Sequence, residues 1–350
     1  MLKLNENSKV YIYCPAGVVT GGIELLHQLS DLLNRKGVDA YIVYLGREPH
    51  EIPSEYKSYQ VKTTEHIIDE ADNLIVYYEA GMIISEIQST IKKAQILFWW
   101  LSIDNYFKGS KHIISLTDHF QFDKLNTLKI IASRVNNLIM KRRNYFKNNI
   151  SFAHQLSDKR IIHAYQSEYA RVFLDNRGIK TLVPLKDYIN IDHTNISSMD
   201  NKEDREDIIL YNPKKGLQFT KKIIAQTPDL NWIPIENMTR LEVVDLMKKS
   251  KLYVDFGNHP GKDRLPRECA MNRCCIITGS RGAAYYFEDI AIDAEYKFDE
   301  KTARIDDIAL KIRSILSNYS TEIDKFDNYR SKILTEKNEF EEQVYTLFFL

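Results

Sequence analysis

The sequence of 350 residues lacks any apolar run that approaches the roughly 20 residues needed to span a bilayer. It has only four cysteines, and the spacing of Cys14, Cys269, Cys274 and Cys275 fits no zinc-binding pattern. It also lacks net charge, because 48 Lys and Arg balance 48 Asp and Glu, so bulk electrostatics give no support to a nucleic-acid partner. The first residues lead almost directly into an apolar strand, without a signal-peptide region. We therefore expect a cytoplasmic protein with reduced, buried thiols.

The length suits two domains of ordinary size better than one. Hydrophobic residues make up 44% of the chain, which is enough to fill two cores, and charged residues make up 27%. The stretch Asn195–Asp207 is polar and charged, so it is the natural linker between domains. On both sides of it, short apolar segments alternate with helical patterns, which is typical of parallel sheets covered on both faces.

The predicted elements follow this rhythm along the whole chain. We expect helices at Gly21–Lys36 and Phe326–Leu350. The predicted strands are Lys9–Cys14, Ala40–Leu45, Leu74–Tyr78, Ile96–Leu101, Ile161–Tyr165, Thr181–Leu185, Ile208–Tyr211, Trp232–Ile235, Leu252–Asp255 and Cys274–Thr278. The fold class predicted from this order is α/β, with two Rossmann-like domains over residues 1–190 and 205–325.

The stretch Asp255–Ala283 carries the strongest functional signal in the chain. A strand runs into a polar loop, and a helix then starts at Leu265-Pro266, where proline suits the first turn. Free backbone N–H groups and the positive end of the helix dipole make such a start an anion site. Lys262, Arg264 and Arg267 add charge there, and Glu268 can accept hydrogen bonds from sugar hydroxyls. This combination suits a nucleoside diphosphate or a nucleotide sugar.

Two other loops between a strand and a helix carry similar chemistry. Gly21 and Gly22 end the loop after the first strand, where glycine lets backbone N–H groups approach a phosphate or a sugar. Lys214 and Lys215 follow the first strand of the second domain and can neutralise a diphosphate. A tight turn and a pair of solvated lysines are the alternative interpretations. The expected donor-binding residues are Gly21, Gly22, Tyr211, Lys214, Lys215, His259, Lys262, Arg264, Glu268, Arg281 and Gly282.

The run from Phe98 to Tyr106 places polar groups at the carboxyl end of a strand in the first domain, where α/β sheets bind ligands. Asp104 is our candidate for the general base that takes a proton from an acceptor hydroxyl. The alternative is a packed aromatic strand end with an Asx turn. The other candidate bases are His154 and His163. The expected acceptor-binding residues are Trp100, Asn105 and Tyr165.

The segment Leu265-Pro266-Arg267-Glu268, the Gly21-Gly22-Ile23-Glu24 loop and the Lys215-Gly216 pair resemble motifs of the GT-B glycosyltransferases. In that family two Glu separated by seven residues hold the nucleotide sugar. Glu268 takes the place of the second, and no Glu stands at the place of the first. The resemblance implies a GT-B-like fold whose two parallel sheets face a central cleft, with the acceptor on the N-terminal side and the donor on the C-terminal side. It also implies that residues 326–350 form a terminal helix that packs back on the first domain.

The function implied is transfer of a sugar from a nucleotide-activated donor to a glycan or lipid-linked acceptor, in bacterial polysaccharide or lipopolysaccharide synthesis. The family requires neither a metal nor a cofactor for this reaction. The His259-Pro260 pair is similar to one in GT-B sialyltransferases, so a CMP-linked sugar remains an alternative donor. Two other classes remain alternatives, namely a nucleotide-sugar epimerase and a catalytically silent GT-B-like binding subunit.

The stretch Lys129–Lys147 is basic and partly amphipathic. One interpretation is peripheral contact with the anionic surface of the inner membrane, which would bring the protein to a lipid-linked acceptor. The other is an ordinary solvated helix face.

Overall fold

The computed structural model describes residues 2–46, 51–79, 84–110, 114–139, 151–156, 158–179, 182–189 and 205–350. The chain divides into two compact units. Unit 1 comprises Met1–Gln166, Ala170–Leu185 and Gln343–Leu350, and unit 2 comprises Ser167–Tyr169 and Lys186–Glu342. The expected linker over Asn195–Asp207 lies mostly outside the described residues, which resume at Arg205.

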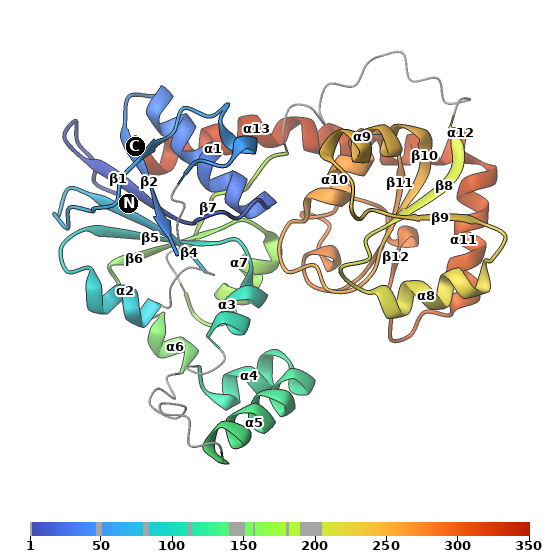
Figure 1. Ribbon diagram of the computed structural model, residues 1–350, viewed down its shortest axis with the longest axis horizontal. Coiled ribbons are helices and arrows are strands. Elements are labelled where there is room, and N and C mark those ends of the chain that lie inside the picture. Colours follow the sequence, from blue (N-terminus) through green and yellow to red (C-terminus); the bar gives the residue numbers. More distant parts are fainter. Residues whose placement is uncertain are drawn as a thin grey trace. The chain divides into compact units, whose positions relative to one another are not determined.

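Unit 1 is built on a parallel sheet with the strand order β3-β2-β1-β4-β5-β6-β7. The central strands β4 and β5 are buried almost throughout, because helices cover both faces of the sheet (Figure 1). The strands are β1 (Lys9–Pro15), β2 (Asp39–Leu45), β3 (Lys62–Thr63), β4 (Leu74–Tyr78), β5 (Gln95–Trp100), β6 (Ile161–Tyr165) and β7 (Leu182–Pro184). The helices are α1 (Gly21–Arg35), α2 (Ile84–Thr90), α3 (Ile103–Gly109), α4 (Leu116–Phe122), α5 (Lys124–Ile139), α6 (Phe152–Gln155) and α7 (Glu168–Asp175), of which α7 belongs to unit 1 from Ala170 onward.

Unit 2 contains a second parallel sheet, with the order β12-β11-β10-β8-β9. Its strands are β8 (Glu206–Tyr211), β9 (Asn231–Pro234), β10 (Ser250–Asp255), β11 (Cys275–Gly279) and β12 (Lys297–Phe298). Its helices are α8 (Leu217–Gln226), α9 (Arg240–Lys249), α10 (Arg264–Met271), α11 (Ile305–Ser317), α12 (Tyr319–Glu322) and α13 (Asp327–Phe348). The last turns of α13, from Gln343 onward, belong to unit 1.

The predicted strands are confirmed, each within two residues at either end. The two strands that the prediction missed, β3 and β12, are two-residue edge strands, which are too short to show a period in the sequence. The four cysteines are free and buried, as expected. Among the described residues, no helix combines the length and apolar character that crossing a membrane requires.

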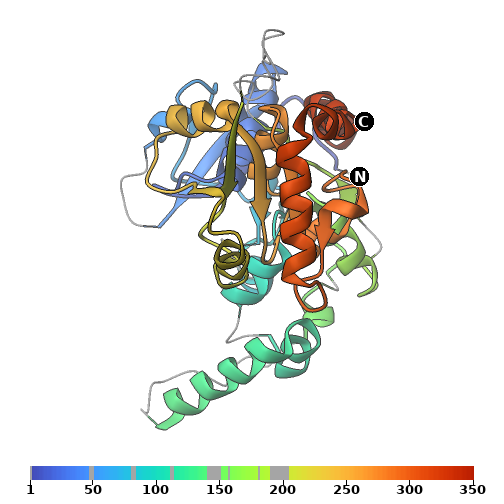
Figure 2. The same ribbon diagram turned by 90° about the vertical axis from the view of Figure 1, so that its right-hand side faces the viewer.

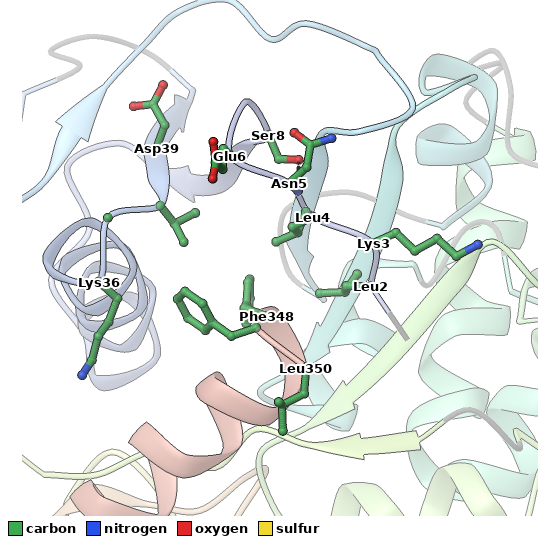
Figure 3. Close-up of a pocket in the computed structure, with 13 residues that line it drawn as sticks. Leu2, Lys3, Leu4, Asn5, Glu6, Ser8, Lys36, Asp39, Phe348 and Leu350 are labelled. Carbon is green, nitrogen blue, oxygen red and sulfur yellow. Dashed lines mark hydrogen bonds between the residues drawn. The ribbon is translucent and has the colours of Figure 1, made fainter.

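Two features of unit 1 lie apart from the strand ends where ligands of α/β sheets bind. Helices α4 and α5 extend away from the sheet in both views (Figures 1 and 2). A pocket of about 540 Å³ lies at the amino ends of the strands, where the segments that lead into β1 and β2 meet the end of α13. Leu2, Leu4 and Phe348 lie around it, with Lys36, Glu6 and Asp39 among its polar residues (Figure 3).

Candidate donor-binding site

The candidate site of unit 2 lies where β8, β10 and β11 end. These three strands are neighbours in the parallel sheet, so the loops that follow them gather at one edge, which is where α/β sheets bind ligands. A pocket of about 470 Å³ is formed by the β8–α8 loop, the first turn of α8 and parts of the other two loops. The lining residues are Pro213, Lys214, Lys215, Gly216, Leu217, Gln218, Phe219, Lys222, Gly257, Asn258, Arg281 and Glu300.

Close contact between two glycines joins the first two loops. Gly216 has a φ of +62°, and a Cβ on it would lie 2.2 Å from the backbone carbon and oxygen of Phe256. Gly257 has a φ of +100°, and its Cβ would lie 2.6 Å from the nitrogen of Gly216. Only glycine allows this backbone conformation and this approach at little cost. Gly216 is also the N-cap of α8, so the contact sets where that helix begins.

Gly282 plays the same part for the third loop. Its φ is +63°, and a Cβ there would lie 2.1 Å from the carbonyl oxygen of His259. That oxygen accepts a hydrogen bond from the backbone N–H of Ala283 at 2.9 Å, and the N–H of His259 donates to Arg281 at 3.3 Å. The structure therefore places Gly282, a predicted donor-binding residue, at a contact that holds two loops together.

The contact at Gly216 leads to a prediction. Gly216→Ala is expected to lower the free energy of unfolding by more than the about 1–2 kcal/mol of a left-handed backbone alone, because Phe256 must also move. Chemical denaturation measures the change. Gly109→Ala is the matched control, since its Cβ would meet nothing within 4 Å and its φ is not positive. Equal stability of the two variants would contradict the argument.

The pocket presents positive charge at the start of a ten-residue helix. Lys214, Lys222 and Arg281 are exposed side chains on its lining. The first N–H groups of an α-helix have no acceptor within the helix, and the dipole makes that end positive. Glu300 supplies a carboxylate on the same lining, and it accepts a hydrogen bond from the N–H of Gly257 at 2.5 Å. This geometry suits an anion that carries hydroxyl groups.

Lys215 is held by acidic side chains instead of projecting freely. Its ammonium lies 3.0 Å from Asp255, pairs with Asp263 and lies 3.2 Å from Nδ1 of His259. Burial alone would lower the pKa of Lys215, but the two carboxylates outweigh this effect and raise the pKa. Burial alone would raise the pKa of Asp263, but Lys215 and the hydrogen bond from His259 hold that pKa at about 2. Lys215 therefore stays charged, with two carboxylates compensating it.

The ligand atoms of Asp255, His259 and Asp263 lie within 4.8 Å of one another, a spacing that suits a metal ion. The ammonium of Lys215 contacts all three residues. Nδ1 of His259 lies 2.8 Å from Asp263, and the His259 side chain is fully buried. The structure thus places His259, which the sequence suggested for a donor phosphate, within this cluster.

The other predicted cations of the β10–α10 loop lie in a buried ion network. Arg267 is fully buried, and its guanidinium donates to Asp187 at 2.8 Å and to Glu336 at 2.7 Å. Lys262 pairs with Glu336 at 2.6 Å, and Nε of Arg264 lies 3.8 Å from Asp187. The charges that we expected at the donor phosphates therefore meet carboxylates of the protein itself. Sequence reasoning missed Asp187 and Glu336, which lie far from the loop along the chain.

Of the predicted donor residues in unit 2, six lie outside the lining of the pocket, namely Gly282, His259, Lys262 and Arg264, whose contacts are given above, and Glu268 and Tyr211. Glu268 is half-buried on α10. Tyr211 is half-buried at the end of β8, where its ring meets the edge of Trp232 at 6.1 Å between centroids. In unit 1, Gly21 and Gly22 are the first residues of α1. Just before them, the hydroxyl of Tyr56 accepts a hydrogen bond from the N–H of Thr20 and donates one to its carbonyl, each at 3.0 Å.

Asp104 and Asn105 lie in the first turn of α3, after β5. Ser102 caps this helix by accepting the N–H of Asn105 at 3.1 Å. Asp104 is buried. This turn stands at the carboxyl end of a central strand, as the sequence predicted, and the helix start favours a negative charge there.

The aromatic residues around this turn are packed inside unit 1. Trp100 is fully buried, and its Nε1 donates to Nδ1 of His163 at 3.1 Å. Burial lowers the pKa of His163 to about 4, so this imidazole is neutral at pH 7. Trp100 therefore offers no open face to a sugar, and His163 is enclosed. His154 is exposed on α6, and Tyr165 is half-buried at the end of β6.

Sequence reasoning missed Glu79, which follows β4 directly. Its carboxylate accepts a hydrogen bond from the N–H of Leu101 at 2.9 Å, just before the turn that carries Asp104. Burial raises the pKa of Glu79 to about 8, against the opposing hydrogen bonds from Leu101, Ser102 and Asn105. Glu79 is thus mostly protonated at pH 7. An acidic residue directly after a buried strand was the available signal.

No protein-family model and no curated protein matches the chain in sequence, whereas solved structures resemble it. HepE from Anabaena in complex with UDP-glucose is 12% identical, with a TM-score of 0.58, over 98% of this chain and 100% of that one. The sucrose-phosphate synthase from Thermosynechococcus elongatus is 11% identical, with a TM-score of 0.61, over 98% of both chains. WaaG, a glycosyltransferase of lipopolysaccharide biosynthesis, is 11% identical, with a TM-score of 0.53, over 97% and 98%.

These similarities show the fold. The chain has the GT-B fold, with two Rossmann-like units on parallel sheets, as the sequence predicted.

Proposed function

We propose that the protein is a glycosyltransferase that moves a sugar from a nucleotide-activated donor to a glycan or lipid-linked acceptor. The observation that carries this proposal is the pocket at the start of α8, where Lys214, Lys222 and Arg281 surround a helix N-terminus. Such a site can stabilise the leaving diphosphate by its dipole and its cations, without a metal ion or a cofactor. The solved complex of HepE with UDP-glucose supports a nucleotide-sugar donor, and WaaG supports a role in bacterial polysaccharide or lipopolysaccharide assembly.

Within this proposal each candidate residue has a separate role. The donor diphosphate lies against the first turn of α8 with Lys214 and Arg281. Glu268 accepts hydrogen bonds from ribose or sugar hydroxyls. Asp104 takes the proton of the acceptor hydroxyl, and Asn105 contacts the acceptor. The missing first Glu of the family pattern favours an inverting reaction.

The diphosphate site predicts a loss of nucleotide affinity in the double variant Lys214→Ala/Arg281→Ala. Each charged hydrogen bond removed is expected to weaken binding by about 1.5–3 kcal/mol, or about tenfold or more, where the contact is shielded from water. Titration calorimetry with UDP, GDP, ADP, dTDP and CMP measures it. Lys248→Ala/Lys249→Ala on α9 is the control, because it removes two exposed positive charges away from the pocket.

Unchanged affinity in the pocket variant would contradict the diphosphate site. Two further outcomes separate the alternative functions. Isomerisation of a nucleotide sugar without an acceptor would indicate an epimerase. Tight nucleotide binding without sugar transfer or donor hydrolysis would indicate a binding subunit.

A further inference from the structure

Helix α5 of unit 1 has a buried face that anchors it. Thr127, Ile130 and Arg134, at a spacing of three and four residues, are buried. The guanidinium of Arg134 donates to the carbonyl of Ile114 at 3.0 Å. One side of the helix is thereby held by the protein. The exposed residues of α5 therefore form a surface that is held in place on unit 1.

That other side is an apolar stripe. Leu128, Ile131, Val135 and Ile139 recur every three or four residues and are 61%, 38%, 48% and 73% exposed. Phe120 on α4 is 49% exposed as well. Single exposed apolar side chains are ordinary on a protein surface, but a contiguous patch marks an interaction site. Because α4 and α5 extend away from the sheet (Figures 1 and 2), the sheet of unit 1 does not cover the stripe.

The charge of this part of the sequence indicates what covers the stripe. Besides the buried Arg134, the sequence has six Lys and Arg and no Asp or Glu between positions 124 and 147, although the whole chain is balanced. Among the described residues, Lys129 is exposed on α5 itself. A second copy of this chain would bring two such basic helices together, which like-charge repulsion opposes. An anionic lipid surface satisfies both features, because headgroups attract the cations and the acyl boundary takes the apolar side chains.

We propose that α5 lies on an anionic lipid surface, with Leu128, Ile131, Val135 and Ile139 inserted at the level of the headgroups. This docking does not depend on the proposed transferase activity, since it concerns another face of unit 1. It would bring the protein to membrane-bound molecules of any kind.

The full chain is tested by co-sedimentation with vesicles of phosphatidylcholine alone and of phosphatidylcholine mixed with phosphatidylglycerol. We expect binding to the anionic vesicles only, and weaker binding at high salt. Leu128→Gln/Ile139→Gln is expected to lower the partition coefficient by about tenfold or more. Leu241→Gln/Leu310→Gln is the matched control, because it replaces two equally exposed leucines on α9 and α11 of unit 2.

Both double variants alter exposed side chains, so their circular dichroism melting curves are expected to match the wild type. Equal binding of the wild type to neutral and anionic vesicles, or no binding to either, would overturn the proposal. So would equal partitioning of the α5 variant and the wild type. A wild-type dimer in gel filtration that the α5 variant abolishes, without vesicle binding, would assign the stripe to self-association instead.

Discussion

Arg267→Met is expected to lower the free energy of unfolding by about 3–5 kcal/mol, the largest stability change that we predict for this protein. Arg267 is fully buried, and its guanidinium carries bonds to both Asp187 and Glu336. Burial by itself would raise the pKa of Asp187, and the charge of Arg267 is the strongest influence that holds it low. Methionine fills a similar space without charge, so it leaves these carboxylates buried beside fewer cations. Lys262 still pairs with Glu336, and most of the loss therefore falls on Asp187.

Urea denaturation followed by circular dichroism measures this change. Arg313→Met is the control, because Arg313 forms a two-bonded pair with Asp229 at 2.6 and 2.7 Å, but in an exposed position. Such pairs contribute little to stability, so the control is expected to change it only slightly. Similar stability of the two variants would show that the buried network does not act as described. A variant that fails to fold at all would agree with the buried role, and Arg267→Lys then provides a milder test.

Asp104→Asn is expected to reduce turnover by about 100-fold or more while donor affinity stays nearly unchanged. A hydroxyl that attacks an anomeric carbon becomes strongly acidic as the bond forms, and a carboxylate can take its proton where an amide cannot. Asp104 is buried in the first turn of α3 at the carboxyl end of β5, with the Ser102 cap fixing the helix start. Burial raises the pKa of the neighbouring Glu79 to about 8, so the protonated form of that side chain, which cannot take up the proton of the acceptor, predominates at pH 7.

The measurement is the rate of sugar transfer with the donor that the nucleotide titrations identify, together with the affinity for its nucleotide. His154→Gln is the comparison variant, since His154 is the exposed alternative base on α6. An active Asp104→Asn protein beside an inactive His154→Gln protein would move the role of base to His154. A product that keeps the donor's anomeric configuration would also contradict the assignment, because a single base-assisted displacement inverts it.

Much of the fold could be predicted because its signals are local. The strands β4, β5 and β11 are short apolar runs bounded by polar residues, and helix α10 begins at the proline-containing turn that marks it in the sequence. The edge strands β3 and β12 were not predicted, because two residues cannot show an alternation of apolar and polar side chains. The loops after β8, β10 and β11 were recognised as a candidate site from their glycines and charges, again because these lie together in the sequence.

The partners of those charges were beyond the reach of the sequence. Arg267 meets Asp187 across 80 residues and Glu336 across 69, and Trp100 meets His163 across 63. A cation beside a helix start is consistent with a phosphate ligand or with a carboxylate from a distant element. Only the packed chain distinguishes the two.

The sequence alone determined the alternation of strands and helices, the parallel character of both sheets and the edge of the unit 2 sheet where charges gather, because hydrophobic period and turn residues act over a few positions. The tertiary structure decided which positively charged side chains remain exposed at that edge. Packing brought carboxylates to Lys215, Lys262 and Arg267, and it left Lys214, Lys222 and Arg281 on the pocket. The physical reason is desolvation, since a buried cation needs partners that replace the water it loses, and carboxylates supply them at these positions.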